Sequence, residues 1–145
     1  MRFVTFVKSD GRVRSGELTE SNLVVDMYEA TKGSLPEKLI DFLENSERNM
    51  KTASQLLQLT EGDLGVYPLH EVRMMAPLPA PKSLRDFYAF EQHVKSAREN
   101  RGLKMIPEWY QIPVFYFSNH LAIKGPEDKI SMPVQCEWLD YELEV

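Results

Sequence analysis

Three prolines in five positions constrain what this chain can fold into. They stand in the segment Ala76-Pro77-Leu78-Pro79-Ala80-Pro81. Proline has no backbone N–H and its φ angle is fixed, so this spacing blocks both a helix interior and a central strand. The segment therefore predicts an extended linker, with a small domain over residues 1–75 and the start of a second domain over residues 76–145.

The first residues have the composition of an antiparallel sheet. Residues 2–7, 13–18 and 22–27 are rich in β-branched, aromatic and aliphatic side chains, which favour strands. Ser9-Asp10-Gly11-Arg12 contains the Asp-Gly pair that is typical of a hairpin turn. These three runs predict a β-meander.

Helical spacing replaces the strand pattern after Gly33. Ser34 is placed as an N-cap, Pro36 suits the first turn, and Glu37 stands three residues after Ser34, as in a capping box. A second helix is predicted over residues 46–59. The apolar residues predicted to face the core of the small domain are Leu35, Leu39, Phe42, Leu43, Met50, Ala53, Leu56 and Leu57.

The remainder of the chain predicts short strands and one helix. The helix covers residues 88–100 and is ended by Arg101-Gly102. Strands are predicted at residues 69–75, 83–87, 113–117 and 129–132. The fold class is therefore α+β, with a small N-terminal α+β domain followed by a mainly-β region.

Composition excludes several classes of protein. The net charge is −5, from 17 basic and 22 acidic residues, whereas a nucleic-acid-binding surface is basic. Cys136 is the single cysteine, which rules out an internal disulfide and a Cys-rich zinc site. No apolar run approaches the roughly 18 residues of a membrane span. We expect no nucleic-acid partner, no membrane insertion, no signal peptide and a cytoplasmic location.

The last seven residues, Leu139-Asp140-Tyr141-Glu142-Leu143-Glu144-Val145, alternate apolar and acidic side chains. On a strand, Asp140, Glu142 and Glu144 would share one face, with neighbours about 7 Å apart. Such a row is either a solvated strand face or a site for a divalent cation, because Mg²⁺, Ca²⁺ and Mn²⁺ prefer carboxylate oxygens.

A second group of polar residues lies in Asp86-Phe87-Tyr88-Ala89-Phe90-Glu91-Gln92-His93. Asp86 falls at a predicted strand-to-helix junction, where it is either an exposed functional carboxylate or a plain N-cap. His93 follows about two helical turns later, on a similar side of the helix. Convergence of this pair with the carboxylate row would place a general base beside a metal ion.

The order of these motifs resembles the fumarylacetoacetate hydrolase family. The resemblance covers residues 69–145, about half of the chain, and the first 68 residues resemble the family's small N-terminal domain only in kind. It rests on the runs Asp86-x-Tyr88 with Gln92-His93, Pro113-Val114-x-Tyr116, Gly125-Pro126, Pro133 and Asp140-x-Glu142-x-Glu144, together with the proline-rich segment.

This resemblance implies a metal-dependent hydrolase of carbon–carbon bonds. It implies that Asp86, Glu142 and Glu144 bind Mg²⁺ or Ca²⁺, or Mn²⁺, and that the metal chelates a small oxo-acid of the β-diketone or acylpyruvate type and stabilises its enolate. It further implies that His93 is the general base. Substrate oxygens would be held by Tyr88, Tyr116 and, with a one-residue shift in alignment, Arg101.

The sequence also departs from the family pattern. Phe115, Phe117 and Ser118-Asn119 replace the family's glycine, histidine and basic residue around the second tyrosine. Family members are longer, and a further carboxylate ligand, a lysine and an acidic partner for His93 would lie beyond Val145. We therefore expect this chain to be the N-terminal half of a homodimeric enzyme of aromatic catabolism. An oxo-acid decarboxylase or isomerase of the same family, and an inactive fragment that acts only as a binding module, remain alternatives.

Overall fold

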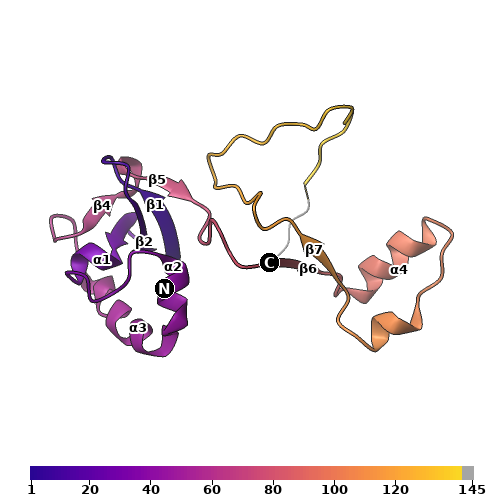
Figure 1. Cartoon of the computed structure of the whole chain (residues 1–145), viewed down its shortest axis with the longest axis horizontal. Helices are drawn as coiled ribbons and strands as arrows, with labels where there is room; N and C mark the ends of the chain where they lie inside the picture. The colour runs from indigo at the N-terminus through magenta and orange to yellow at the C-terminus, as the bar shows by residue number, and fades with distance from the viewer. Residues whose placement is uncertain (142–145) are drawn as a thin grey trace. The chain divides into compact units, whose positions relative to one another are not determined.

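A computed structural model describes residues 1–141 of the chain. Its elements are, in chain order, β1 (Phe3–Val7), β2 (Val13–Leu18), β3 (Leu23–Asp26), α1 (Met27–Ala30), α2 (Leu39–Glu44), α3 (Ser46–Ala53), the 3-10 helix η1 (Leu56–Gln58), β4 (Val66–Pro68), the 3-10 helix η2 (Leu69–Glu71), β5 (Arg73–Met75), β6 (Leu84–Phe87), α4 (Glu91–Glu99), the 3-10 helix η3 (Pro107–Tyr110) and β7 (Phe115–Ser118). Figure 1 traces them. The fold is α+β, as predicted.

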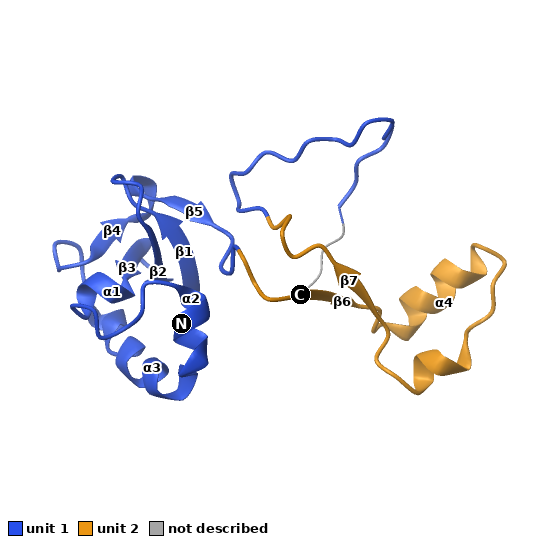
Figure 2. Ribbon diagram, in the orientation of Figure 1, with its two compact units in different colours: residues 1–79, 124–145 blue, residues 80–123 orange. Residues whose placement is uncertain are grey.

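The chain divides into two compact units. One holds Met1–Pro79 and the segment that starts at Lys124, and the other holds Ala80–Ile123 (Figure 2). None of the helices among residues 1–141 has the length and apolar composition needed to span a bilayer.

The first unit is built on a five-stranded antiparallel sheet with the order β4-β3-β2-β1-β5. The meander prediction is confirmed for β1, β2 and β3, because alternating apolar residues and a tight turn encode it locally. The turn between β1 and β2 carries Gly11 at φ +83°, and its N–H donates to the carbonyl of Lys8 over 2.9 Å. Only glycine adopts that conformation without steric cost.

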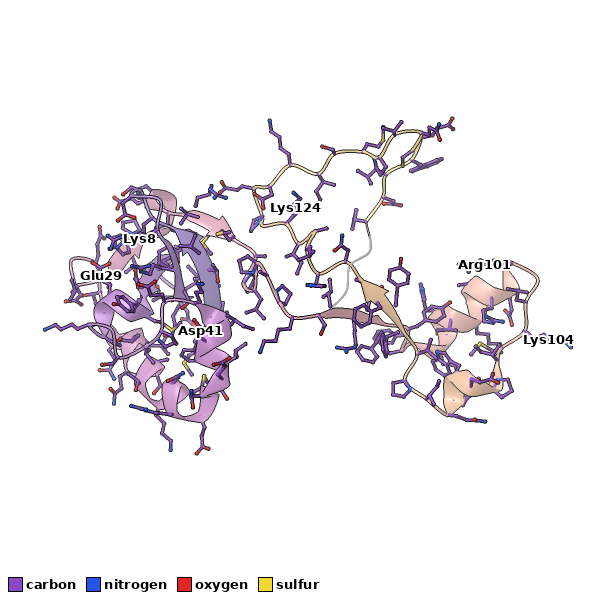
Figure 3. All side chains as sticks on the ribbon, in the orientation of Figure 1. Lys8, Glu29, Asp41, Arg101, Lys104 and Lys124 are labelled. Carbon is purple, nitrogen blue, oxygen red and sulfur yellow. The ribbon has the colours of Figure 1, made fainter. Side chains whose placement is uncertain are left out.

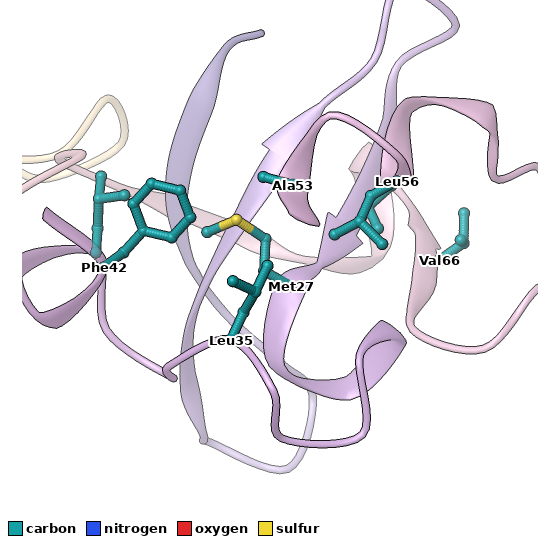
Figure 4. Close-up of a cluster of buried hydrophobic side chains, with 8 residues drawn as sticks. Met27, Leu35, Phe42, Ala53, Leu56 and Val66 are labelled. Carbon is teal, nitrogen blue, oxygen red and sulfur yellow. The ribbon is translucent and has the colours of Figure 1, made fainter. Parts of the chain in front are cut away.

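Each face of this sheet carries its own apolar cluster. The face under α1–α3 holds the larger one, which includes Met27, Leu35 and Phe42 (Figure 4). The partly buried ring of Phe3 packs against it, with 5.0 Å between its centroid and that of Phe42. Burial of one such aromatic side chain contributes about 1.5–3 kcal/mol. The opposite face buries Val4, Phe6 and Val24 beneath the residues that connect β4 to β5.

The predicted capping box at Ser34 is wrong. The helix α2 begins at Leu39, five residues later than the predicted cap. The reason is tertiary: the Glu37 side chain pairs with Arg14 on β2, with 3.2 Å between Oε1 and Nη2, instead of returning to cap the helix. The backbone carbonyl of Glu37 also accepts from the N–H of Ser15 over 2.8 Å, which keeps this segment beside the sheet.

The predicted core of the helices is largely confirmed. Leu35, Leu39, Phe42, Ala53 and Leu56 are buried, and Met50 packs against them. Two residues differ: Leu43 is 47% exposed and Leu57 is 44% exposed. The helix α3 ends at Ala53 rather than continuing to residue 59, and the tighter turn of η1 directs Leu57 outward.

The segment that starts at Lys124 contacts the edge strand β5. Arg73 pairs with Asp128 at 3.7 Å, and Asp128 accepts from the backbone N–H of Gly125 over 2.8 Å. A Cβ atom at position 125 would lie 3.0 Å from the Cα of Met75, so the close approach suits glycine. The predicted strand at residues 129–132 does not form, because no described strand pairs with it.

The second unit contains a two-stranded antiparallel ribbon of β6 and β7. The helices α4 and η3 lie in the connection between these two strands. The strand predicted at residues 83–87 is confirmed, and the one predicted at 113–117 begins two residues later. Between residues 80 and 141 the remaining chain is irregular.

The predicted closing strand is not found among the described residues. Leu139, Asp140 and Tyr141 form no strand, and the rest of that segment lies outside the described residues.

Candidate functional site

The β6–β7 ribbon places Asp86 directly opposite Tyr116. The register pairs Leu84 with Ser118, Arg85 with Phe117, Asp86 with Tyr116 and Phe87 with Phe115. The pairing continues one residue beyond β6, since the N–H of Tyr88 donates to the carbonyl of Val114 over 3.0 Å. Because side chains alternate along a strand, Asp86, Tyr88 and Tyr116 share one face of the ribbon.

Asp86 is a strand residue and not a helix cap. It lies within β6, whereas α4 begins at Glu91 and has Phe90 at its N-cap position. This arrangement excludes the alternative in which the Asp86 carboxylate is used to cap the helix. It also corrects the prediction that the helix begins at Tyr88 and carries Asp86 and His93 on similar sides, because three residues separate the strand from the helix.

His93 lies in the first turn of α4, next to Tyr88. The two rings meet edge to face, with 6.0 Å between their centroids and 87° between their planes. His93 is exposed, and it lines a shallow groove along α4 together with Phe90, Gln92, Ser96, Ala97 and Asn100. The ribbon therefore places Asp86, Tyr88 and Tyr116 on one face, and the start of α4 brings His93 against Tyr88. These are four of the residues predicted from sequence.

The 3-10 helix η3 contacts the junction between β6 and α4. The indole N–H of Trp109 donates to the backbone carbonyl of Tyr88 over 2.7 Å. The hydroxyl of Tyr110 donates to Oε1 of Glu91 over 2.8 Å, and this hydrogen bond raises the pKa of Tyr110. The sequence analysis assigned no role to Trp109, Tyr110 or Glu91. The Trp-Tyr pair after Pro107 was the available signal, but nothing local indicates what it contacts.

Arg101 is not brought to this group. It follows the C-terminal end of α4, in the loop that leads toward η3, and its side chain is exposed (Figure 3). The helix separates it from His93 by about two turns, so the described residues do not place its guanidinium with Asp86 and Tyr116.

The predicted metal ligands are only partly described. Asp86 is half-buried on the ribbon, whereas Glu142 and Glu144 lie outside the described residues. Among residues 1–141, no three His, Cys, Asp or Glu side chains come close enough together to hold a metal ion. Asp86 is thus the single predicted ligand whose position is defined.

The opposite face of the ribbon is aromatic and carries one cation. The guanidinium of Arg85 lies 5.4 Å from the ring centroid of Phe115 and 5.2 Å from that of Phe117. Phe87 packs on the same side, with its centroid 5.3 Å from that of Phe115. The two phenylalanines that depart from the family pattern therefore project away from the face that carries Asp86 and Tyr116.

A second charged cluster lies in the first unit. Asp26 is buried, accepts from the backbone N–H of Glu29 over 3.0 Å, and lies 3.8 Å from Lys8 and 3.6 Å from Arg14. Lys8 also pairs with Glu29, which accepts from the Tyr67 hydroxyl over 2.6 Å (Figure 3). Each carboxylate faces a cation, so this cluster serves to fix α1 against the sheet.

No protein-family model matches the sequence, and a search of curated proteins found no match.

Proposed function

We propose that this protein is a divalent-metal-dependent hydrolase that cleaves a carbon–carbon bond in an oxo-acid of the acylpyruvate type. One observation carries the proposal: the pairing of β6 with β7 puts Asp86, Tyr88 and Tyr116 on one face of the ribbon, and the start of α4 brings His93 against Tyr88. These are four of the residues to which the resemblance to the fumarylacetoacetate hydrolase family assigns metal binding, substrate binding and base catalysis.

Asp86, Glu142 and Glu144 would hold the cation, which we propose to be Mg²⁺ or Ca²⁺, with Mn²⁺ as a substitute. Carboxylate oxygen suits each of these hard cations. The half-buried position of Asp86, which is not used in capping, supports this role. When bound, the ion would supply Lewis acidity toward the oxo groups of the substrate.

His93 would act as the general base. Its neutral imidazole takes a proton from water, and the hydroxide adds to the acyl carbonyl carbon. The bond between that carbon and the neighbouring methylene then breaks, with its electron pair leaving on the methylene side, which gains a proton. Water is thus consumed, and a carboxylate and a pyruvate-type product are formed.

Tyr88 and Tyr116 would bind substrate oxygens through their hydroxyl groups, which donate and accept hydrogen bonds. Both lie on the face of the ribbon that carries Asp86. The resemblance assigns the substrate carboxylate to Arg101, although the described residues do not bring its guanidinium to this face. We further propose a homodimer, as the family resemblance implies, and a cytoplasmic location, which the single cysteine favours.

Metal binding is the first test. Isothermal titration of the full-length protein with Mg²⁺ and Mn²⁺ should show one site, with affinity falling at least about tenfold in Asp86→Asn and Glu142→Ala. Glu127→Gln, which removes an exposed carboxylate elsewhere, is the control and should bind as the wild type does. Metal affinities of Asp86→Asn and Glu142→Ala equal to that of the wild type would contradict the metal assignment.

The substrate class is the second test. Acylpyruvates, fumarylpyruvate-like compounds and oxaloacetate should be assayed side by side with the metal-loaded protein. We expect hydrolysis of acylpyruvates and a loss of kcat of about a hundredfold or more in His93→Gln. Activity confined to oxaloacetate would reject the hydrolase and favour a decarboxylase on the same scaffold.

A further inference from the structure

The connection between the strand that carries Asp86 and the helix that carries His93 is short. Residues 88–90 join β6 to α4, and the helix has no side-chain cap, because Phe90 occupies the N-cap position. The angle between strand and helix is therefore not fixed by capping. It determines how the His93 imidazole lies relative to Asp86 and Tyr88.

Two consecutive residues of η3 hold this connection from its two ends. Trp109 donates to the carbonyl of Tyr88 on the strand side over 2.7 Å, and Tyr110 donates to Glu91 in the first turn of α4 over 2.8 Å. The rings of Trp109 and Tyr110 meet edge to face, with centroids 5.0 Å apart and planes at 87°. The two hydrogen bonds thus share one rigid support.

The contact between Tyr88 and His93 links the two ends. Their edge-to-face rings require both the position of Tyr88 on the strand and the position of the first helical turn. Trp109 fixes the position of Tyr88 through its backbone carbonyl, and Tyr110 fixes the first turn of α4 through Glu91. Neither η3 residue is among the groups proposed to contact substrate.

We propose that Trp109 and Tyr110 are positioning residues, which set the geometry of Tyr88 and His93 respectively. The proposal rests on the proposed function. Small displacements of a base or of a binding group lower rate or affinity steeply, since catalysis needs reacting groups in a narrow range of positions. The two residues act through different partners, so their loss has different kinetic consequences.

The kinetic test compares two variants that each delete one donor. Trp109→Phe keeps an aromatic ring but removes the N–H, and should raise KM about fivefold with kcat within about twofold. Tyr110→Phe removes one oxygen from an exposed residue, and should lower kcat about fivefold with KM within about twofold. Trp138→Phe, a change at an exposed tryptophan of the other unit, is the matched control and should alter neither.

A readout without catalysis separates this inference from the proposed function. The imidazole resonances of His93, assigned by loss of signal in His93→Gln among the three histidines, should shift in Trp109→Phe and Tyr110→Phe but not in Trp138→Phe. If the wild type hydrolyses no acylpyruvate, the proposed function fails while this shift still supports the positioning role.

A purely structural role predicts something else. Trp109→Phe and Tyr110→Phe would then lower thermal stability alone, with the His93 resonances, KM and kcat unchanged. That outcome, or identical KM and kcat changes in the two variants, would overturn the proposal.

Discussion

At the scale of single residues, two buried acids lie on neighbouring strands in opposite situations. Asp26 on β3 has Lys8 and Arg14 beside it, and burial raises its pKa against their attraction. Glu17 on β2 is fully buried between Phe3 and Val25, and neither of its carboxylate oxygens has a hydrogen-bond partner. Burial raises the pKa of Glu17 to about 7 from 4.5, and the one charge acting on it is the N-terminal ammonium, which lowers it.

Glu17 should make the first unit less stable as pH rises. Below pH 4.5 its carboxyl is protonated in both folded and unfolded chains, and between 4.5 and about 7 only the unfolded chain releases the proton. The free energy of unfolding should therefore fall by about 3 kcal/mol across this window and not further above it. Urea denaturation from pH 4.5 to 8 measures the decline. Glu17→Gln should remove the part due to Glu17 and leave the part due to the raised pKa of Asp26.

The control for this experiment is Glu20→Gln, at an exposed acid in the turn after β2. It should keep the pH slope of the wild type. Wild type and Glu17→Gln with the same slope would contradict the assignment of the decline to Glu17.

At the scale of elements, the packing of β2 against its neighbours depends on the lack of a side chain at Gly16. A Cβ atom there would lie 2.4 Å from the carbonyl oxygen of Val25 and 2.9 Å from the ring of Phe6. The first contact is with backbone of the paired strand and the second is with a fully buried ring, so neither yields easily.

Gly16→Ala should therefore destabilise the protein by about 1–3 kcal/mol, the usual cost of overpacking a well-filled core. Urea denaturation at pH 7 measures the change. Gly11→Ala is the comparison, because position 11 is open but has φ +83°. It should cost about 1 kcal/mol from the backbone conformation alone. A smaller loss of unfolding free energy in Gly16→Ala than in Gly11→Ala would contradict this prediction, because it would mean that the strands move apart to admit the methyl group.

At the scale of the whole molecule, the two units differ in how much apolar surface they bury. Both apolar clusters belong to the first unit, whereas Val94 is the one buried apolar side chain of the described residues beyond Pro79. In the second unit, large aromatic residues such as Phe90 and Phe117 are 82% and 61% exposed. Local stability follows buried apolar contact, so the units should open independently.

Native-state hydrogen exchange should show this difference. We expect amides of β1–β3 to be protected on the order of a hundredfold more than those of β6, β7 and α4, because the second unit has little buried surface. Limited proteolysis should first cut between residues 80 and 141. Equal protection in the two units would contradict the prediction.

The sequence predicted those parts of the fold that are encoded locally. The meander follows from alternation and the Asp-Gly turn, and Asp86, Tyr88, Tyr116 and His93 were found as candidates from motif order. The capping box at Ser34 failed because Glu37 pairs with Arg14, which lies 23 residues away in sequence. The prediction for Leu57 failed because α3 ends at Ala53. Leu43 lies within α2 but on its exposed side.

The sequence by itself determined the α+β class, the strands of the first sheet and the residues able to carry chemistry. Tertiary structure decided that Asp86 is a strand residue opposite Tyr116, that His93 packs on Tyr88, and that Trp109 and Tyr110 hold the junction between them. Strand alternation and turn residues act between near neighbours, so sequence reveals them. A hydrogen bond between residues about twenty positions apart depends on how the chain returns, and only the folded structure specifies that return.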